Sequence, residues 1–175
     1  MRSRPLGFGG SVAIVAAVLL LPACGLQQGL VQQPGGTGQP PSQAPAISGT
    51  TLTGSHFSWT STHGHPVVLD FWASWCGPCR AEQSQLNALV QRYGPRGVLF
   101  VGIDMRDDQA QASAYRSDYS VAYQSVVDSD EQISALYNVA APPTILVIDA
   151  SGRIVDRLLG TLVGISDDLD RLTAH

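Results

Sequence analysis

The stretch from Val67 to Arg80 constrains the fold more than any other part of the chain. It opens with an apolar run, Val67 to Phe71, which is too short for a helix and suits a buried strand. Two cysteines, Cys76 and Cys79, follow with Gly and Pro between them, and a helical pattern continues from there. The sequence thus places a cysteine pair at the point where a buried strand passes into a helix.

The two cysteines are spaced so that they can form and break a disulfide. At positions i and i+3 of a first helical turn, Cys76 and Cys79 are expected about 5–6 Å apart, within the roughly 4.4–6.8 Å between Cα atoms that a disulfide needs. The unpaired N–H groups and the positive dipole end of that turn favour a thiolate on Cys76. Pro78 fits there because its missing N–H would have no partner. These residues predict a redox-active pair.

A zinc site or a purely structural disulfide is the alternative interpretation of the pair. Zinc would need a second Cys or His pair at ligand spacing, and no other cysteine lies near Cys79. His63 and His65 stand together in a polar turn without a third ligand beside them. We therefore interpret the histidines as turn residues and expect no metal.

The rest of the domain alternates helical and strand patterns. We predict a short hairpin around Gly54, a helix from Cys79 to Tyr93, a strand over 98–103, a helix over 107–119 and a strand over 124–127. A capping box at Asp128 and Glu131 then opens a further helix, strands over 144–148 and 154–159 form a hairpin, and a closing helix begins at Ser166. This order predicts an α/β fold with a mixed central β-sheet flanked by helices.

The motif from Asp70 to Arg80, Asp-Phe-Trp-Ala-x-Trp-Cys-Gly-Pro-Cys-Arg, resembles the active-site segment of thioredoxins. Glu82, three residues after Cys79, makes the chain more similar to the TlpA-like branch, the membrane-tethered or secreted thiol-disulfide oxidoreductases. The resemblance covers about residues 48–173. It implies a thioredoxin-like fold with the TlpA-type helix-strand insertion between the second and third core strands. It also implies action on protein disulfides without a cofactor.

The resemblance implies a role for each residue of the cysteine pair. Cys76, at the exposed lip of the helix, attacks a substrate disulfide and forms a mixed disulfide, which Cys79 resolves. Asp70 aligns with the acid that relays the proton of the inner cysteine, and a lone carboxylate on a buried strand would otherwise be costly. Glu82 either shares this role or is an ordinary solvated helix residue.

A second group of residues is expected to contact the substrate. Trp75 shields the disulfide, and Gly77 and Pro78 lie between the two sulfurs. The second strong motif runs from Pro142 to Asp149, and its Pro143 aligns with the cis-proline of the family, which docks the substrate chain. The residue before it, Pro142, has no N–H to offer to that chain.

The N-terminal region reads as an export signal. Basic Arg2 and Arg4 precede a short apolar run and then Leu21-Pro22-Ala23-Cys24, which resembles a bacterial lipobox with Cys24 as the lipidated residue. A plain secretory signal cleaved nearby is the alternative.

Residues 25–46 are rich in Gln, Gly and Pro and carry no charge, so they cannot bury enough surface to fold. We expect a signal peptide over 1–23, a flexible linker over 24–46 and a thioredoxin-like domain over 47–175.

These observations favour a lipid-anchored reductase on the outer side of the cell membrane. Gly77-Pro78 resembles reducing thioredoxin, near about −270 mV, rather than the oxidising branch near about −120 mV. The electrons would come from a membrane thiol donor, and apocytochrome c maturation is one family role that fits. The alternatives are a disulfide-forming oxidase and an interaction lipoprotein with an idle redox fold. A peroxidase is disfavoured because Ala73 stands where peroxiredoxins have Thr.

Charge excludes one further class of function. The net charge is −4, and no basic cluster occurs, so we expect no binding to nucleic acid. We expect the protein to be a monomer.

Overall fold

A computed structural model describes residues 42–174 of the chain. Its strands are β1 (Ser48–Thr50), β2 (His56–Ser58), β3 (Val67–Trp72), β4 (Leu99–Met105), β5 (Gln124–Asp128), β6 (Thr144–Ile148) and β7 (Ile154–Leu159). Its helices are α1 (Gly77–Tyr93), α2 (Gln109–Asp118), α3 (Gln132–Leu136) and α4 (Ile165–Leu172), with short 3-10 turns η1 (Trp59–Thr62) and η2 (Gly94–Arg96). The predicted α/β order is confirmed, including the helix α2 and strand β5 of the insertion.

The central sheet has five strands in the order β5-β4-β3-β6-β7. Strand β3 runs parallel to β4 and antiparallel to β6, so the sheet is mixed, as predicted. All six residues of β3 are buried, which explains why this segment reads as an almost unbroken apolar run. Asp70 lies at the centre of the sheet, where it is paired with Gly102 on β4 and Ile145 on β6.

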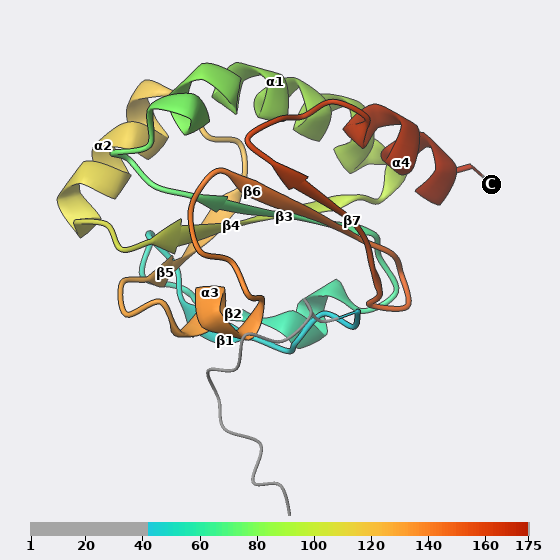
Figure 1. Cartoon of the computed structure of the whole chain (residues 1–175), viewed down its shortest axis with the longest axis horizontal. Helices are drawn as coiled ribbons and strands as arrows, with labels where there is room; N and C mark the ends of the chain where they lie inside the picture. Colours follow the sequence, from blue (N-terminus) through green and yellow to red (C-terminus); the bar gives the residue numbers. More distant parts are fainter. Residues whose placement is uncertain (1–41, 175) are drawn as a thin grey trace, which may run out of the picture. The chain divides into compact units, whose positions relative to one another are not determined.

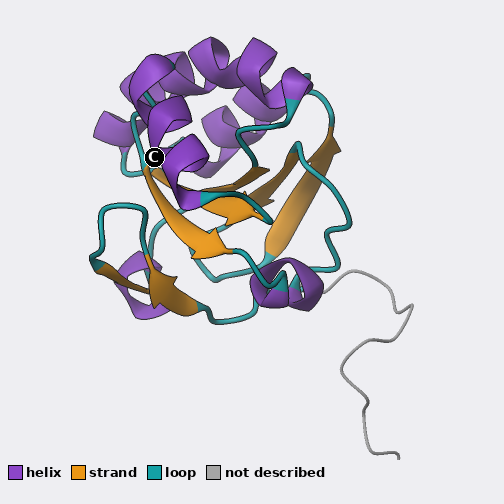
Figure 2. Ribbon diagram, turned by 90° about the vertical axis from the view of Figure 1, so that its left-hand side faces the viewer, coloured by secondary structure: helices purple, strands orange, loops and turns teal. Residues whose placement is uncertain are grey.

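Two layers of packing cover this sheet (Figure 1, Figure 2). Helices α1, α2 and α4 lie on one face, and α3 lies on the other with η1 and the small β1–β2 hairpin. Side chains alternate between the two faces along β3. Val68 and Trp72 belong to the core under α1, whereas Leu69 and Phe71 belong to the core on the α3 side. By the same alternation Asp70 faces the α1 side.

The predicted capping box at Asp128 and Glu131 is wrong in its form. The Asp128 carboxylate accepts the N–H groups of Ile133 and Ser134, each at 2.8 Å, and so caps α3 alone. Glu131 has a positive φ of 59° and does not reach back to Asp128, because its carboxylate pairs with Arg106 at 2.9 Å. Asp128, the last residue of β5, therefore caps α3 without the reciprocal hydrogen bond from Glu131 that a capping box requires.

The expected signal peptide, Cys24 and most of the expected linker lie outside the described residues. Residues 42–46, which we assigned to the linker, pack on the domain instead. Ala44 is buried and donates its N–H to Gly152 O at 2.8 Å, and the Tyr137 hydroxyl donates to Pro45 O at 2.7 Å. Backbone pairing with the β6–β7 turn thus starts the packed region earlier than residue 47. None of the helices within residues 42–174 is long and apolar enough to cross a membrane.

Candidate active site

The cysteine pair lies where β3 ends and α1 begins. Cys76 is the N-cap residue of α1 and Cys79 lies in its first turn, and the two are joined by a disulfide with Cα atoms 5.3 Å apart. The spacing predicted from the sequence is confirmed. Because β3 is fixed on both sides by β4 and β6, the sheet holds the start of α1 in place.

The N-cap position distinguishes the two sulfurs chemically. The backbone N–H of Cys79 donates to Cys76 Sγ at 3.1 Å. A thiolate at this place would keep that hydrogen bond and would lie at the positive end of the helix dipole. The geometry therefore favours Cys76 as the nucleophile and leaves Cys79 as the resolving thiol.

The expected exposure of Cys76 is wrong. Cys76 is only 2% exposed and Cys79 only 3%, because both side chains turn into the core under α1. The exposed residues around them are Trp75, Gly77 and Pro78. These three residues form exposed surface next to the buried disulfide, and their contact with a substrate stays a prediction.

The loop before Cys76 is fixed from two sides. Asp107 accepts both the N–H and the hydroxyl of Ser74, the latter at 2.7 Å, and the Arg80 guanidinium donates to Ser74 O. Asp107 follows β4, so the neighbouring strand anchors the active-site loop. Sequence reasoning missed this residue, since only the pairing of β3 with β4 brings it to Ser74.

The two tryptophans have different environments. Trp75 is 50% exposed, and its indole N–H donates to Arg106 O at 3.2 Å while the Arg106 guanidinium lies 5.6 Å from the ring centre. Trp72 is buried, donates to Ser125 Oγ at 3.0 Å and stacks on Tyr115 with ring centres 4.5 Å apart. Trp75 thus offers an aromatic surface beside the disulfide, and Trp72 belongs to the same buried cluster as the two cysteines.

Asp70 is a buried acid with one occupied oxygen. The Tyr123 hydroxyl donates to Oδ2 at 2.6 Å, whereas Oδ1 has no hydrogen-bond partner among the described residues. Burial raises the pKa of Asp70 to about 7; the Tyr123 hydrogen bond opposes this rise and the nearby charge of Glu82 adds to it. A carboxyl group with this pKa can accept and return a proton near neutral pH.

Glu82 lies one helical turn beyond Cys79 and is only 9% exposed. Burial raises the pKa of Glu82 to about 7, and its Oε1 has no hydrogen-bond partner among residues 42–174. The interpretation of Glu82 as an ordinary solvated residue is therefore wrong. The α1 side of the sheet thus holds Asp70 and Glu82, two buried acids with pKa values near 7, and a third buried acid, Asp104 on β4, whose pKa burial raises to about 8.

Tyr115, Tyr119 and Tyr123 are spaced four apart in the sequence, and Tyr115 and Tyr123 are buried. The hydroxyl groups of these two buried tyrosines also form hydrogen bonds, which the sequence spacing did not predict. Both lie within hydrogen-bond distance of Gln83 Oε1, and that of Tyr123 also reaches Asp70. These polar partners come from α1 and β3, far from the tyrosines in sequence.

The expected substrate-docking prolines lie at the same edge of the sheet as the disulfide. The Pro142–Pro143 bond is cis, as the resemblance implied. Pro143 immediately precedes β6, and the first residue of β6, Thr144, pairs with Phe71 near the end of β3. Pro142 and Pro143 are half-buried and line an open cavity of about 540 Å³. Apolar Val139 and Leu159 contribute to the same cavity.

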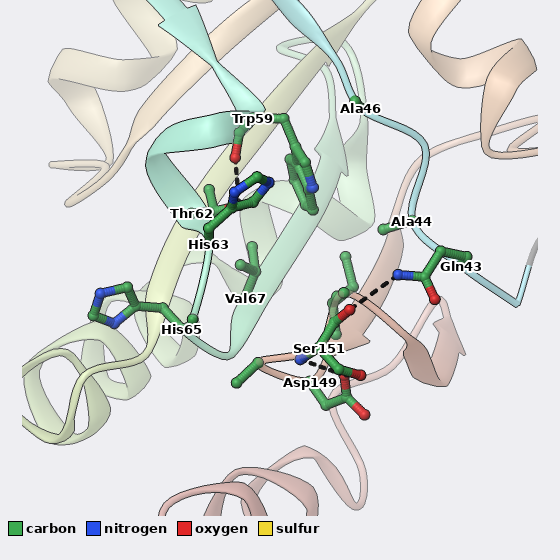
Figure 3. Close-up of a pocket in the computed structure, with 14 residues that line it drawn as sticks. Gln43, Ala44, Ala46, Trp59, Thr62, His63, His65, Val67, Asp149 and Ser151 are labelled. Atoms are coloured by element: carbon green, nitrogen blue, oxygen red, sulfur yellow. Dashed lines mark hydrogen bonds between the residues drawn. The ribbon is translucent and has the colours of Figure 1, made fainter.

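A separate cavity of about 400 Å³ lies at the other end of β3, beside Val67 (Figure 3). His63 and His65 line it, but their rings point in different directions, and His65 Nδ1 lies 3.1 Å from Gly97 O. In residues 42–174 no group of three or more His, Cys, Asp or Glu side chains could hold a metal ion. This cavity is separated from the disulfide by the length of β3.

Comparisons with known proteins agree with this geometry. The family model described as AhpC/TSA family matches residues 40–157. The thioredoxin-like protein YneN of Bacillus subtilis is 34% identical over 122 residues, which cover 69% of this chain and 71% of that protein. The thiol-disulfide oxidoreductase ResA of Bacillus thuringiensis is 28% identical over 118 residues, covering 67% and 68%.

A solved structure shows the same fold with a similar sequence. It is a secreted Mycobacterium tuberculosis disulfide oxidoreductase, described as homologous to Escherichia coli DsbE. It is 31% identical, with a TM-score of 0.63, and the alignment covers 73% of this chain and 94% of that one.

Proposed function

Since the chain belongs to the AhpC/TSA family and is a thiol-disulfide oxidoreductase of the ResA and DsbE type, we propose that it reduces protein disulfides outside the cytoplasmic membrane. The observation that carries the proposal is the asymmetry of the cysteine pair. Cys76 Sγ accepts the Cys79 N–H at the start of α1, and two buried acids with pKa values near 7 lie on the same side of the sheet.

In the proposed reaction the Cys76 thiolate attacks one sulfur of a substrate disulfide and releases the other as a thiolate, which takes up a proton. Asp70 then accepts the proton of the Cys79 thiol. The Cys79 thiolate attacks Cys76 Sγ, which releases the second substrate sulfur and closes the Cys76–Cys79 disulfide. The substrate gains two electrons, and a membrane thiol donor would restore the dithiol.

The reducing direction is supported by Gly77 and Pro78 between the cysteines, as in reducing thioredoxin. The competing proposal is a disulfide-forming oxidase of the same fold. Measurement of the reduction potential of the Cys76–Cys79 couple separates them: a value near about −270 mV supports a reductase, and one near about −120 mV supports an oxidase. A redox-idle interaction protein would form no mixed disulfides with substrates at all.

Membrane anchorage through Cys24 is a separate part of the proposal, supported by the Leu21-Pro22-Ala23-Cys24 motif. Metabolic labelling with a fatty acid should mark the wild-type protein, and Cys24→Ser should abolish the label. Two or more acyl chains are needed for stable attachment. A mature protein that begins downstream of Cys24 would end this part and leave the redox chemistry untouched.

Apocytochrome c, a polypeptide with paired cysteines, is the substrate class that fits a ResA-type reductase.

Pro142 should weaken the grip on an extended substrate chain. Without an N–H, Pro142 offers one hydrogen bond fewer to a peptide laid beside Pro143. Such a bond is worth about 0.5–1.5 kcal/mol, so Pro142→Thr should tighten binding of a model peptide disulfide by up to roughly tenfold. The apparent affinity, measured from the substrate dependence of thiol release, would be unchanged if this account of Pro142 were wrong.

A further inference from the structure

We propose that Tyr123, Gln83 and Tyr115 form a proton-responsive hydrogen-bond network that sets the pH at which Asp70 can take the proton of Cys79. The proposal rests on the proposed function only for the identity of the proton donor. In it Tyr123 and Gln83 are positioning residues, because they act through Asp70 and do not touch the substrate.

The network is buried and continuous from α1 to β3. The Tyr115 hydroxyl lies 3.2 Å from Cys79 O and 3.1 Å from Gln83 Oε1. The Tyr123 hydroxyl lies 3.2 Å from the same Gln83 oxygen and 2.6 Å from Asp70 Oδ2. Gln83 is 1% exposed, and its amide donates to Asn87 Oδ1 at 3.0 Å, so its oxygen is directed to the tyrosines.

The network contains fewer protons than acceptors. Each tyrosine hydroxyl can donate only one proton, yet together they face three acceptors: Cys79 O, Gln83 Oε1 and Asp70 Oδ2. When Asp70 is ionised, Tyr123 donates to Asp70 and Tyr115 donates to Gln83. Two of the four contacts then lack a proton: that of Cys79 O with Tyr115 and that of Gln83 Oε1 with Tyr123.

Protonation of Asp70 supplies one further proton and reverses the donors. The carboxylic acid then donates to the Tyr123 oxygen, Tyr123 turns its own proton to Gln83 Oε1, and Tyr115 donates to Cys79 O. In this arrangement Cys79 O, Gln83 Oε1 and the Tyr123 oxygen each receive one proton, and only the contact between the Tyr115 hydroxyl and Gln83 Oε1 carries none. The network therefore accommodates both states of Asp70, as a proton relay requires.

The proton transfer balances within the protein. The S–H bond of Cys79 breaks and an O–H bond forms on Asp70 Oδ2, which then donates to the Tyr123 oxygen. The Cys79 thiolate then closes the disulfide with Cys76 and releases the substrate thiolate. The proton held by Asp70 leaves with that thiolate or to solvent.

Ionisable groups act on Asp70 from the helical side. Its strand partners, Gly102 on β4 and Ile145 on β6, carry none. The groups that do are Glu82 on α1, Tyr115 on α2, and Tyr123 just before β5. Asp104, two residues after Gly102 on β4, is a further buried acid on this side of the sheet. Because Glu82 titrates in the same range, the tests are best made with Glu82→Gln present in every protein compared.

The first test is Tyr123→Phe in the full-length protein. Loss of the hydroxyl removes a hydrogen bond that favours the ionised carboxylate, so the titration of Asp70 should move to higher pH by about one unit or more. Carbon-13 NMR of the Asp70 carboxyl, assigned by its absence in Asp70→Asn, reads this directly. In single-turnover release of substrate thiol, the rate at pH 6 should fall about tenfold while the rate at pH 9 stays the same.

The second test is Gln83→Met, which keeps the side-chain length and removes the acceptor that Tyr123 needs when Asp70 is protonated. The protonated state loses a hydrogen bond, so the Asp70 titration should move to lower pH, opposite to the effect of Tyr123→Phe. Shifts of the same sign, or none, would overturn the reversible network.

Tyr137→Phe is the matched control. Tyr137 is a buried tyrosine whose hydroxyl donates to Pro45 O on the α3 side of the sheet, so its loss should not move the Asp70 titration. The two readouts separate two failures. If the protein reduces no disulfide, the NMR shifts remain and only the proposed function fails. If thiol release is normal but the NMR titration is the same in all variants, the network is wrong.

Discussion

The side chains on the two faces of β3 are buried in different surroundings. On the α3 side, Leu69 and Phe71 are fully buried among apolar side chains, and Phe71 meets the edge of Tyr137 with ring centres 5.6 Å apart. On the α1 side, Asp70 shares the buried space with Glu82 and with tyrosine hydroxyls. Both faces pack an apolar core, but the α1 side also places buried acids next to the cysteines, at a cost in stability.

The largest effect is expected from the cysteines on the α1 side. Cys79→Ser removes the resolving thiol, so turnover should stop and substrates should accumulate as mixed disulfides on Cys76. Cys76→Ser should stop turnover without such adducts. Non-reducing gels with mass spectrometry measure both. Adducts that accumulate on Cys76→Ser instead would reverse the two roles.

A substitution on the α3 side should harm stability and leave the chemistry unchanged. Phe71→Ala empties a fully buried site and should lower the free energy of unfolding by about 3–5 kcal/mol, as measured by urea denaturation. Phe71→Leu, which keeps most of the volume, should lose much less. The pH at which Asp70 titrates should stay the same in both variants, and a clear shift would show that the faces are coupled.

Asp70→Asn changes the residue next to Phe71, and it should impair the chemistry without harming stability. Without the proton acceptor, resolution by Cys79 at neutral pH should slow about a hundredfold or more. The pKa of Asp70 rises from 3.8 to about 7 on folding, so the folded state holds the proton more tightly. Stability is then fully present below about pH 4 and falls as the pH rises through 7.

The variant therefore has a stability signature as well as a kinetic one. Asp70→Asn removes that loss and should be more stable than the wild type at pH 8, by up to about 4 kcal/mol, with a smaller difference at pH 4. Thermal melts at the two pH values measure this. A variant less stable than the wild type at pH 8 would mean that Asp70 stabilises the fold, contrary to the difference described between the two faces of β3.

The smallest effect is expected from Glu82→Gln. The charge of Glu82 raises the pKa of Asp70, so its removal should move the pH dependence of thiol release toward lower pH, with little change in the rate at its plateau. Gln85→Ala, an exposed change on the same helix, is a control. A loss of the plateau rate itself would move the relay from Asp70 to Glu82.

Sequence reasoning predicted those parts of the site that depend on local spacing. The disulfide geometry follows from two cysteines three residues apart, and the buried strand follows from its apolar run. The hydrogen bond between Tyr123 and Asp70 could not be predicted, because the two residues lie 53 positions apart and only the sheet order makes them neighbours. The hold of Asp107 on Ser74 and the burial of Cys76 depend on tertiary contacts in the same way.

The packing of Ala44 and Pro45 fixes the place at which the chain joins the domain. Ser42 O accepts the N–H of Ile154 at 2.9 Å, and Gln43 pairs with Arg153, both at the start of β7. Pro143 and the disulfide lie at the opposite edge of the sheet, about 17 Å away along β6. A tether that continues from residue 42 would be attached at the end away from the disulfide. If the protein is anchored through Cys24 as proposed above, the end of the sheet that carries the disulfide faces away from the point of attachment.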